Sequence, residues 1–130
     1  MEFWDIYNAD REKTGRTMAR GEEMNPGEYH LVVHICVFNR EGRLLIQQRQ
    51  PFKTGFSGLW DITVGGSALR GEGGKQAAER ELFEEIGLKT ELSDRPNFSV
   101  NFERGFDDFY ITQRDVKLSE LTYNTMRCGG

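Results

Sequence analysis

The chain has 130 residues, a formal net charge of −4, 29% charged residues and 12% aromatic residues. This length fits one domain, residues 1–130, and the composition excludes a disordered chain. The negative charge argues against a general nucleic-acid binder. The start, MEFWDIYNADREK, lacks the basic and apolar parts of a signal peptide, and no apolar run is long enough to cross a membrane. We therefore expect a soluble cytoplasmic protein with neither membrane nor nucleic-acid partners.

The first half of the chain is predicted to be rich in strands. Segments 2–7 and 16–20 are separated by turn residues and predict an N-terminal hairpin. Residues 29–38, YHLVVHICVF, are apolar at nearly every position, which is typical of a central strand covered on both faces. The turn NREG then leads into a strand at 43–49, and a further short strand is expected at 59–64.

A single helix is predicted in the middle of the chain. It begins near Gly74 or Lys75 and stops at Gly87, a residue type that commonly ends helices. Apolar residues recur every four positions, which places a buried stripe on one face, formed by Ala78, Leu82 and Ile86.

Beyond the helix, strands are expected at 98–102 and 109–112, joined by the acidic and aromatic turn ERGFDD. The final stretch, TYNTMRCGG, has neither helical periodicity nor a clear strand pattern.

Three acidic residues of the helix share one face. Glu81, Glu84 and Glu85 are spaced so that they point the same way, and like charges this close are unfavourable unless a cation offsets them. Divalent ions such as Mg²⁺ prefer such oxygen ligands. The preceding segment is expected to be a tight loop able to approach a metal or phosphate, because it contains Gly65, Gly66, Gly71, Gly73 and Gly74.

This segment resembles the signature of the Nudix hydrolases, in which Gly, five residues, Glu and seven residues precede Arg-Glu-aliphatic-x-Glu-Glu-x-Gly-aliphatic. The match, residues 66–88, is complete: Gly66, Glu72, Arg80, Glu81, Leu82, Glu84, Glu85, Gly87 and Leu88. The resemblance implies an α/β fold, an α/β/α sandwich around a mixed β-sheet. Because the final stretch shows no helical pattern, we expect the family's C-terminal helix to be missing. Three explanations compete: an altered or truncated chain, a fold completed by a homodimer, and a sheet face left for another partner; an uncovered apolar face favours association.

The resemblance also implies the site. Glu81, Glu84 and Glu85, with the carbonyl of Gly66, would hold Mg²⁺ or Mn²⁺, while Glu72 and Arg80 would brace the loop and helix. We expect Glu84, Glu85 and Arg80 to be catalytic. The general base of the family is either a box carboxylate or an acidic residue elsewhere, and the outside candidates are Glu103, Asp107 and Asp108.

Upstream, from about residue 4 to 88, the chain resembles the isopentenyl-diphosphate isomerase branch of the family. Arg49 and Lys53 stand where that branch carries basic residues near the diphosphate, and Trp60, with Phe52 and Phe56, could line a substrate pocket. The isomerase branch has a catalytic Cys and a metal-binding His near the first box glycines, whereas this chain has VGGS at 64–67.

The expected function is therefore metal-dependent hydrolysis of a diphosphate bond, in a nucleoside diphosphate linked to another moiety or a similar small molecule. Two alternatives remain: an isoprenoid diphosphate isomerase, and a non-catalytic module that binds a nucleotide or metabolite.

Overall fold

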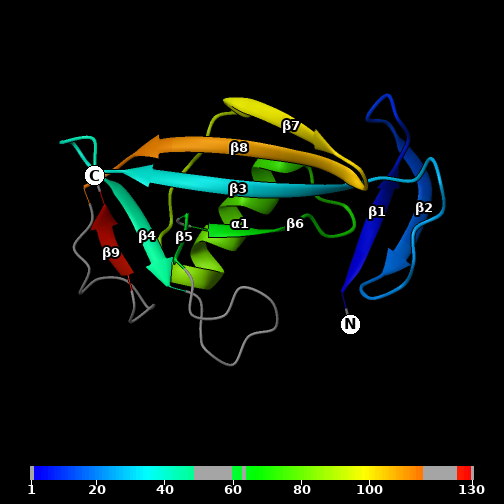
Figure 1. Ribbon diagram of the computed structural model, residues 1–130, viewed down its shortest axis with the longest axis horizontal. Coiled ribbons are helices and arrows are strands. Elements are labelled where there is room, and N and C mark those ends of the chain that lie inside the picture. Colours follow the sequence, from blue (N-terminus) through cyan, green and yellow to red (C-terminus); the bar gives the residue numbers. More distant parts are fainter. Residues whose placement is uncertain (1, 49–59, 63, 116–125, 130) are drawn as a thin grey trace.

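A computed structural model describes residues 2–48, 60–62, 64–115 and 126–129. The predicted N-terminal hairpin is confirmed: β1 (Phe3–Tyr7) pairs antiparallel with β2 (Lys13–Ala19). This two-stranded ribbon stands at one end of the main sheet (Figure 1). Two backbone hydrogen bonds between Tyr7 and Tyr29, of 2.8 and 3.0 Å, connect it to the segment that enters the sheet.

The main sheet is mixed. Its strand order is β5-β4-β3-β8-β7, with β6 also paired to β3 and β9 to β4. β3 and β8 run parallel along their whole lengths, and the other pairs are antiparallel. The predicted central strand is thus confirmed as β3. The strands are β3 (His30–Phe38), β4 (Leu44–Gln48), β5 (Trp60–Ile62), β6 (Val64–Ser67), β7 (Phe98–Phe102), β8 (Gly105–Gln113) and β9 (Met126–Gly129).

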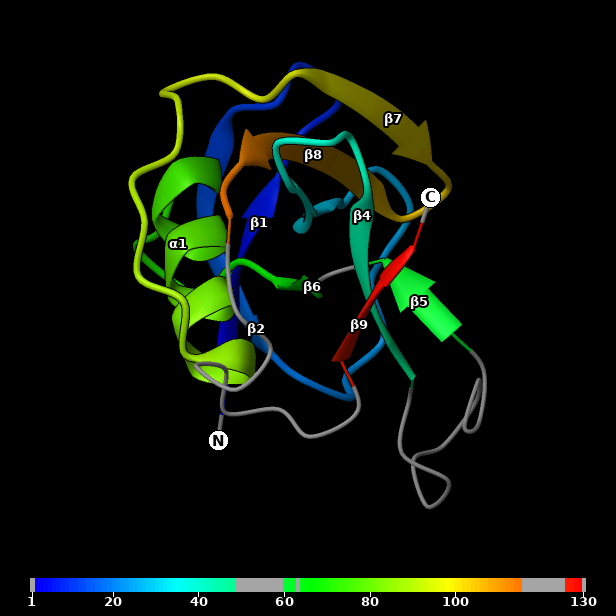
Figure 2. The same cartoon turned by 90° about the vertical axis from the view of Figure 1, so that its left-hand side faces the viewer.

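Helix α1 (Gly74–Ile86) packs on one face of this sheet (Figure 2). Gly87 ends it with a φ of 74°, a left-handed conformation that glycine adopts without strain. The predicted stripe is confirmed, since Ala78, Leu82 and Ile86 are fully buried against alternate residues of β3. Burial of each large aliphatic side chain contributes about 1.5–3 kcal/mol, so this contact fixes the helix on the sheet.

The chain thus has the predicted α/β architecture, and α1 is the one helix in the part of the chain that is described. Within that part, no helix is long and apolar enough to cross a bilayer.

Some predicted boundaries are wrong. The single strand expected at 59–64 is two strands, β5 and β6, which pair with different partners. The expected turn ERGFDD is mostly strand, because β8 already starts at Gly105, where it aligns with His30 of β3. The glycine-rich loop is also shorter than expected, since Gly65 and Gly66 belong to β6 and Gly74 begins α1.

The last described residues also differ from expectation. Met126–Gly129 forms β9, which pairs with β4, although the sequence there shows no strand pattern. Such a strand is set by its partner's backbone, a tertiary effect that local sequence does not report.

The two faces of β3 are unequal. Leu31, Val33, Ile35 and Val37 point toward α1 and are buried, whereas the alternate residues are half-buried. On that second face the exposed hydrophobic side chains include Phe98, Val100 and Phe102 of β7. Among the described residues, the cover expected on both sides of this strand is complete only on the α1 side, and the other face is incompletely covered, in line with the expectation of an exposed sheet face.

Candidate active site

The first candidate ligands lie where α1 crosses β6. A Cβ atom at Gly66 would stand 2.5–2.8 Å from the carboxyl atoms of Glu81, so only a glycine lets this carboxylate lie against the strand backbone. A glycine at position 66 therefore allows the helix side chain to approach the strand backbone closely. The Glu81 carboxylate and the backbone of Gly66, two of the predicted ligands, are brought together by this packing.

Arg80 connects the acidic residues of the helix. Its Nη1 donates to Glu81 Oε1 at 2.7 Å and to Glu84 Oε2 at 3.0 Å. One cationic nitrogen thus holds two carboxylates that would otherwise repel each other. Glu81 is largely buried, with 16% of its side chain exposed, whereas Glu84 is 58% exposed.

Glu72 holds the other edge of the same guanidinium. Arg80 Nε and Nη2 donate to Glu72 Oε2 and Oε1 at 2.7 and 3.0 Å, a two-point pairing. This hydrogen bonding is the main cause that raises the pKa of Arg80 above its ordinary value. Nη2 also donates to the carbonyl of Ser67 at 3.2 Å, so Arg80 connects β6, the loop and α1.

The loop before the helix is closed by short hydrogen bonds. Glu72 Oε1 accepts from the Leu69 amide at 2.8 Å, and Gly71 has a φ of 87°. At the helix start, Gln76 Oε1 accepts from the Gly73 amide at 2.8 Å. The brace that the sequence assigned to Glu72 and Arg80 is present.

The donor chemistry fits a hard divalent ion, because Glu81 and Glu84 already share one cation and Glu85 follows on the same helix. As the side chains stand, however, no three His, Cys, Asp or Glu side chains of the described residues converge on one point. Arg80 Nη1 occupies the position between Glu81 and Glu84. Metal binding would thus exchange this nitrogen for the ion.

The three acidic residues outside the box lie in different surroundings. Asp108 is 2% exposed; it accepts from Arg11 Nη1 and Nη2 at 3.0 and 2.8 Å and from Ser99 Oγ at 2.5 Å. Asp107 Oδ1 lies 2.6 Å from His34 Nδ1 on the opposite face of the sheet. Glu103 is exposed in the short turn between β7 and β8. Of the three, Asp108 is the least suited to be a general base, because it is buried and held by a cation.

The predicted substrate-binding residues Arg49 and Lys53 lie outside the described residues. Trp60 begins β5, where it is opposite Gln48 of β4, but its side chain is outside the description.

Gly65, next to Gly66 on β6, faces the other side of the sheet. A Cβ atom there would stand 2.7 Å from Cδ2 and 2.9 Å from Nε2 of His34, so the imidazole occupies the space that a side chain would need. His34 is also stacked on Phe109, with ring centroids 5.0 Å apart. A cysteine at position 65 would therefore displace this ring.

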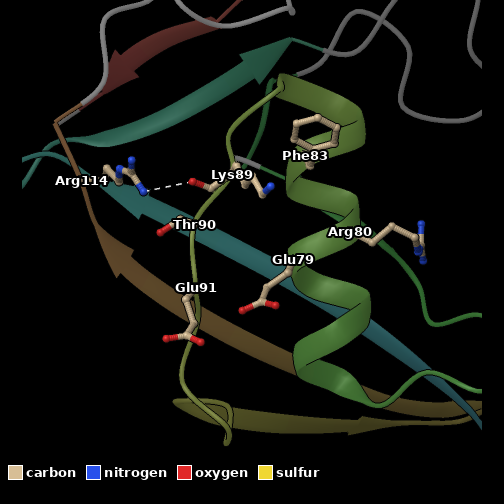
Figure 3. Close-up of a pocket in the computed structure, with 7 residues that line it drawn as sticks. All are labelled: Glu79, Arg80, Phe83, Lys89, Thr90, Glu91 and Arg114. Carbon is tan, nitrogen blue, oxygen red and sulfur yellow. Dashed lines mark hydrogen bonds between the residues drawn. The ribbon is translucent and has the colours of Figure 1, made fainter.

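A cavity of about 670 Å³ lies beside α1, between the helix and the segment that follows it. Phe83, Lys89, Thr90 and Arg114 line it, and Arg80 at its border points to the other side of the helix (Figure 3). Arg114 Nη1 donates to the carbonyl of Lys89 at 3.2 Å. This cavity is thus separated by the helix from the Glu81–Glu84 pair and is not the place where those carboxylates meet.

Sequence reasoning missed the partners that come from far along the chain. Arg11 pairs with a residue 97 positions away, and His34 with one 73 positions away. Neither pair has a spacing signal. A third distant contact, between Asp5 of β1 and the Gly71 amide, did leave a sign in the sequence: Asp5 is the one acidic residue in an otherwise apolar and aromatic strand.

Comparison with known proteins identifies the family. The family model for the NUDIX domain matches residues 28–124, and the chain belongs to the Nudix hydrolase family. It is 54% identical over 123 residues to an uncharacterized Nudix hydrolase of Listeria monocytogenes, across 94% of this chain and 73% of that one.

One further relative in sequence and one solved structure are also similar to this chain. An isopentenyl-diphosphate Delta-isomerase of Halorhodospira halophila is 37% identical over 103 residues, covering 79% of this chain and 59% of its own. A crystal structure of a Deinococcus radiodurans protein superposes with a TM-score of 0.78 and 26% identity, over 98% of this chain and 83% of that chain. The membership of the Nudix family that the box indicated is confirmed, and the isomerase-like relatives that residues 4–88 indicated are also found.

Proposed function

We propose that this chain is a divalent-metal-dependent hydrolase that cleaves a diphosphate bond in a small organic molecule, such as a nucleoside diphosphate linked to another moiety. One observation carries the proposal: Arg80 Nη1 gathers Glu81 and Glu84 beside the backbone of Gly66. The helix face therefore presents a cation-binding pair of carboxylates next to a bare strand backbone.

In this proposal Glu81, Glu84, Glu85 and the carbonyl of Gly66 hold Mg²⁺ or Mn²⁺. When bound, such an ion neutralises diphosphate charge and lowers the pKa of a bound water. Arg80 keeps its two bonds to Glu72 through Nε and Nη2 when Nη1 gives up the carboxylates. The two-point pairing of Arg80 with Glu72 would thus hold the helix against the loop both with and without the metal ion.

We place the general base among the box glutamates and Glu103. Asp108 is a poor candidate for the base, because it is buried and paired with Arg11. Asp107 is engaged with His34 on the face away from α1. Glu84, whose side chain is 58% exposed, is an accessible carboxylate at the proposed ion, which favours a box carboxylate as the base.

The isomerase alternative is weakened by the packing at β6. The stretch 64–67 has no thiol, and the space beside Gly65 is filled by the His34 ring. Without a thiol at this position, the proton donor that the resemblance leads one to expect is absent.

The test is a product-release assay on nucleoside, sugar and prenyl diphosphate compounds, with Mg²⁺ and with a chelator. Cleavage that requires the metal supports the hydrolase. A rearranged prenyl diphosphate without release supports the isomerase instead, and tight binding without any turnover supports the non-catalytic module.

A further inference from the structure

The N-terminal ribbon contacts the loop that leads into α1. Its strand β1 provides two acceptors: the carbonyl of Phe3 accepts from the Arg70 amide, and Asp5 Oδ2 accepts from the Gly71 amide, both at 2.8 Å. From β2, Lys13 Nζ donates to the carbonyl of Glu72 at 3.3 Å. Three successive loop residues are therefore held by the ribbon.

Asp5 is the centre of these contacts. Its Oδ2 also pairs with Lys13 Nζ at 3.0 Å, and 15% of its side chain is exposed. One carboxylate oxygen thus joins the two ribbon strands to the loop. Gly71, the residue it holds, has the left-handed φ of 87° that turns the chain just before Glu72.

The held loop carries the brace of the proposed site. Glu72 follows Gly71 directly and binds Arg80 at two points, and Arg80 in turn binds Glu81 and Glu84. A continuous path of hydrogen bonds therefore runs from Asp5 through the loop backbone to the two carboxylates.

The ribbon has its own anchor on the sheet. Arg11, in the hairpin turn, forms the two-point ion pair with the buried Asp108, and its guanidinium lies 4.9 Å from the Phe106 ring centroid. Trp4 stacks on His30 with ring centroids 4.5 Å apart. These contacts hold the ribbon at the end of the main sheet, where Figure 1 shows β1 and β2.

We propose that Asp5, with Lys13, is a positioning residue for the metal-binding carboxylates: the ribbon sets the loop that aims the Glu72–Arg80 fork. The inference rests on the proposed function for its effect on catalysis. The ribbon precedes residues 28–124, which the family model matches.

The experiment compares Asp5→Ala and Asp5→Asn with wild type. We expect Asp5→Ala to weaken Mn²⁺ binding, measured without substrate, several-fold and to lower kcat by a similar factor. Asp5 acts through the loop and the Glu72–Arg80 fork, so the effect should be smaller than the roughly 10–100-fold that loss of a partner bound directly to a metal ligand costs. KM should change less than kcat. Asp5→Asn keeps an acceptor for the Gly71 amide, so it should recover part of the loss.

A matched control is Glu2→Ala, which removes a carboxylate just before β1 whose ion pair, at 3.3 Å, is with Arg20 and not with a loop residue. It should leave Mn²⁺ binding and turnover unchanged. Amide exchange at Gly71 gives a readout independent of activity, and we expect it to accelerate in Asp5→Ala and not in Glu2→Ala.

The outcomes separate the two proposals. Wild type that neither binds Mn²⁺ nor cleaves a diphosphate overturns the proposed function, whereas the Gly71 exchange still tests the ribbon contact. Active wild type with unchanged Mn²⁺ binding and turnover in Asp5→Ala overturns the positioning role alone. If Asp5→Ala fails to fold, Asp5→Asn decides the same comparison.

Discussion

Arg80 and Glu72 form a two-point fork, with Nε–Oε2 at 2.7 Å and Nη2–Oε1 at 3.0 Å, and this fork leaves Nη1 to hold Glu81 and Glu84. The nitrogens of the guanidinium thus bind different carboxylates: Nε and Nη2 bind Glu72, and Nη1 binds the two helix glutamates. A lysine supplies one point charge and cannot serve both edges at once.

The Arg80→Lys variant should therefore fold normally but no longer hold Glu72, Glu81 and Glu84 in their present arrangement. We expect turnover to fall by about 10–100-fold, because the helix and loop are no longer held at two points. Steady-state kinetics with a circular dichroism melt measures both effects. Arg95→Lys, on the exposed loop after α1, is the control. Unchanged turnover in Arg80→Lys would show that the fork has no part in the reaction.

The packing of His34 on Gly65 gives a second prediction. Gly65→Cys should lower the free energy of unfolding by about 1–3 kcal/mol, because the new side chain collides with the imidazole. The double variant Gly65→Cys with His34→Ala should recover part of this loss, since the ring is gone. Urea unfolding of the four chains measures the coupling. Equal losses in both backgrounds would contradict the collision.

The ribbon anchor predicts a large effect on stability. Arg11→Ala leaves the Asp108 carboxylate buried without its cation, and loss of one partner of a buried pair costs about 3–5 kcal/mol. We expect the lower end of this range, because 40% of the Arg11 side chain is exposed. Urea unfolding gives the value. Arg16→Ala breaks a pair with Glu28 in which the arginine is 60% exposed, and it should cost about 1 kcal/mol or less.

Tyr110 predicts a loss of stability at high pH. Burial, aided by the nearby Asp108 charge, raises the pKa of its phenol to about 12, from an ordinary value of 10.0. Because the folded state binds this proton more tightly, the contribution is fully present below pH 10 and is lost as pH rises through 12. Tyr110→Phe should be less sensitive to pH between 10 and 12. Absorbance titration of the phenol, with unfolding curves at each pH, checks this; equal pH profiles would contradict it.

The sequence predicted those helices and strands whose own residues show a periodic pattern or a terminating residue. The helix was predicted because Ala78, Leu82 and Ile86 repeat at the helical period and Gly87 ends it. The start of β8 and the existence of β9 were not predicted, because they depend on pairing with β3 and β4.

The site shows the same division. Spacing along the helix predicted that Glu81 and Glu84 lie together, and the box predicted the Glu72–Arg80 brace. It did not predict that Asp5 would hold Gly71, since that contact joins residues 66 positions apart. Contacts at such separations follow from the assembled fold, and no local pattern encodes them.

The central claim is that the box glutamates bind the ion that hydrolysis requires. Its most direct test is Mg²⁺-dependent turnover of a cleaved diphosphate, together with Mn²⁺ binding, in wild type, Glu84→Gln and Glu85→Gln. Glu91→Gln is the control, because that carboxylate is 86% exposed on the loop after α1.

We expect wild type and the control to show the same saturable metal dependence. Glu84→Gln and Glu85→Gln should melt like wild type, bind Mn²⁺ more weakly and lose more than the roughly 100-fold in turnover that an outer-shell change costs. Full metal binding and turnover in both folded variants would contradict the assignment of these glutamates to the metal site.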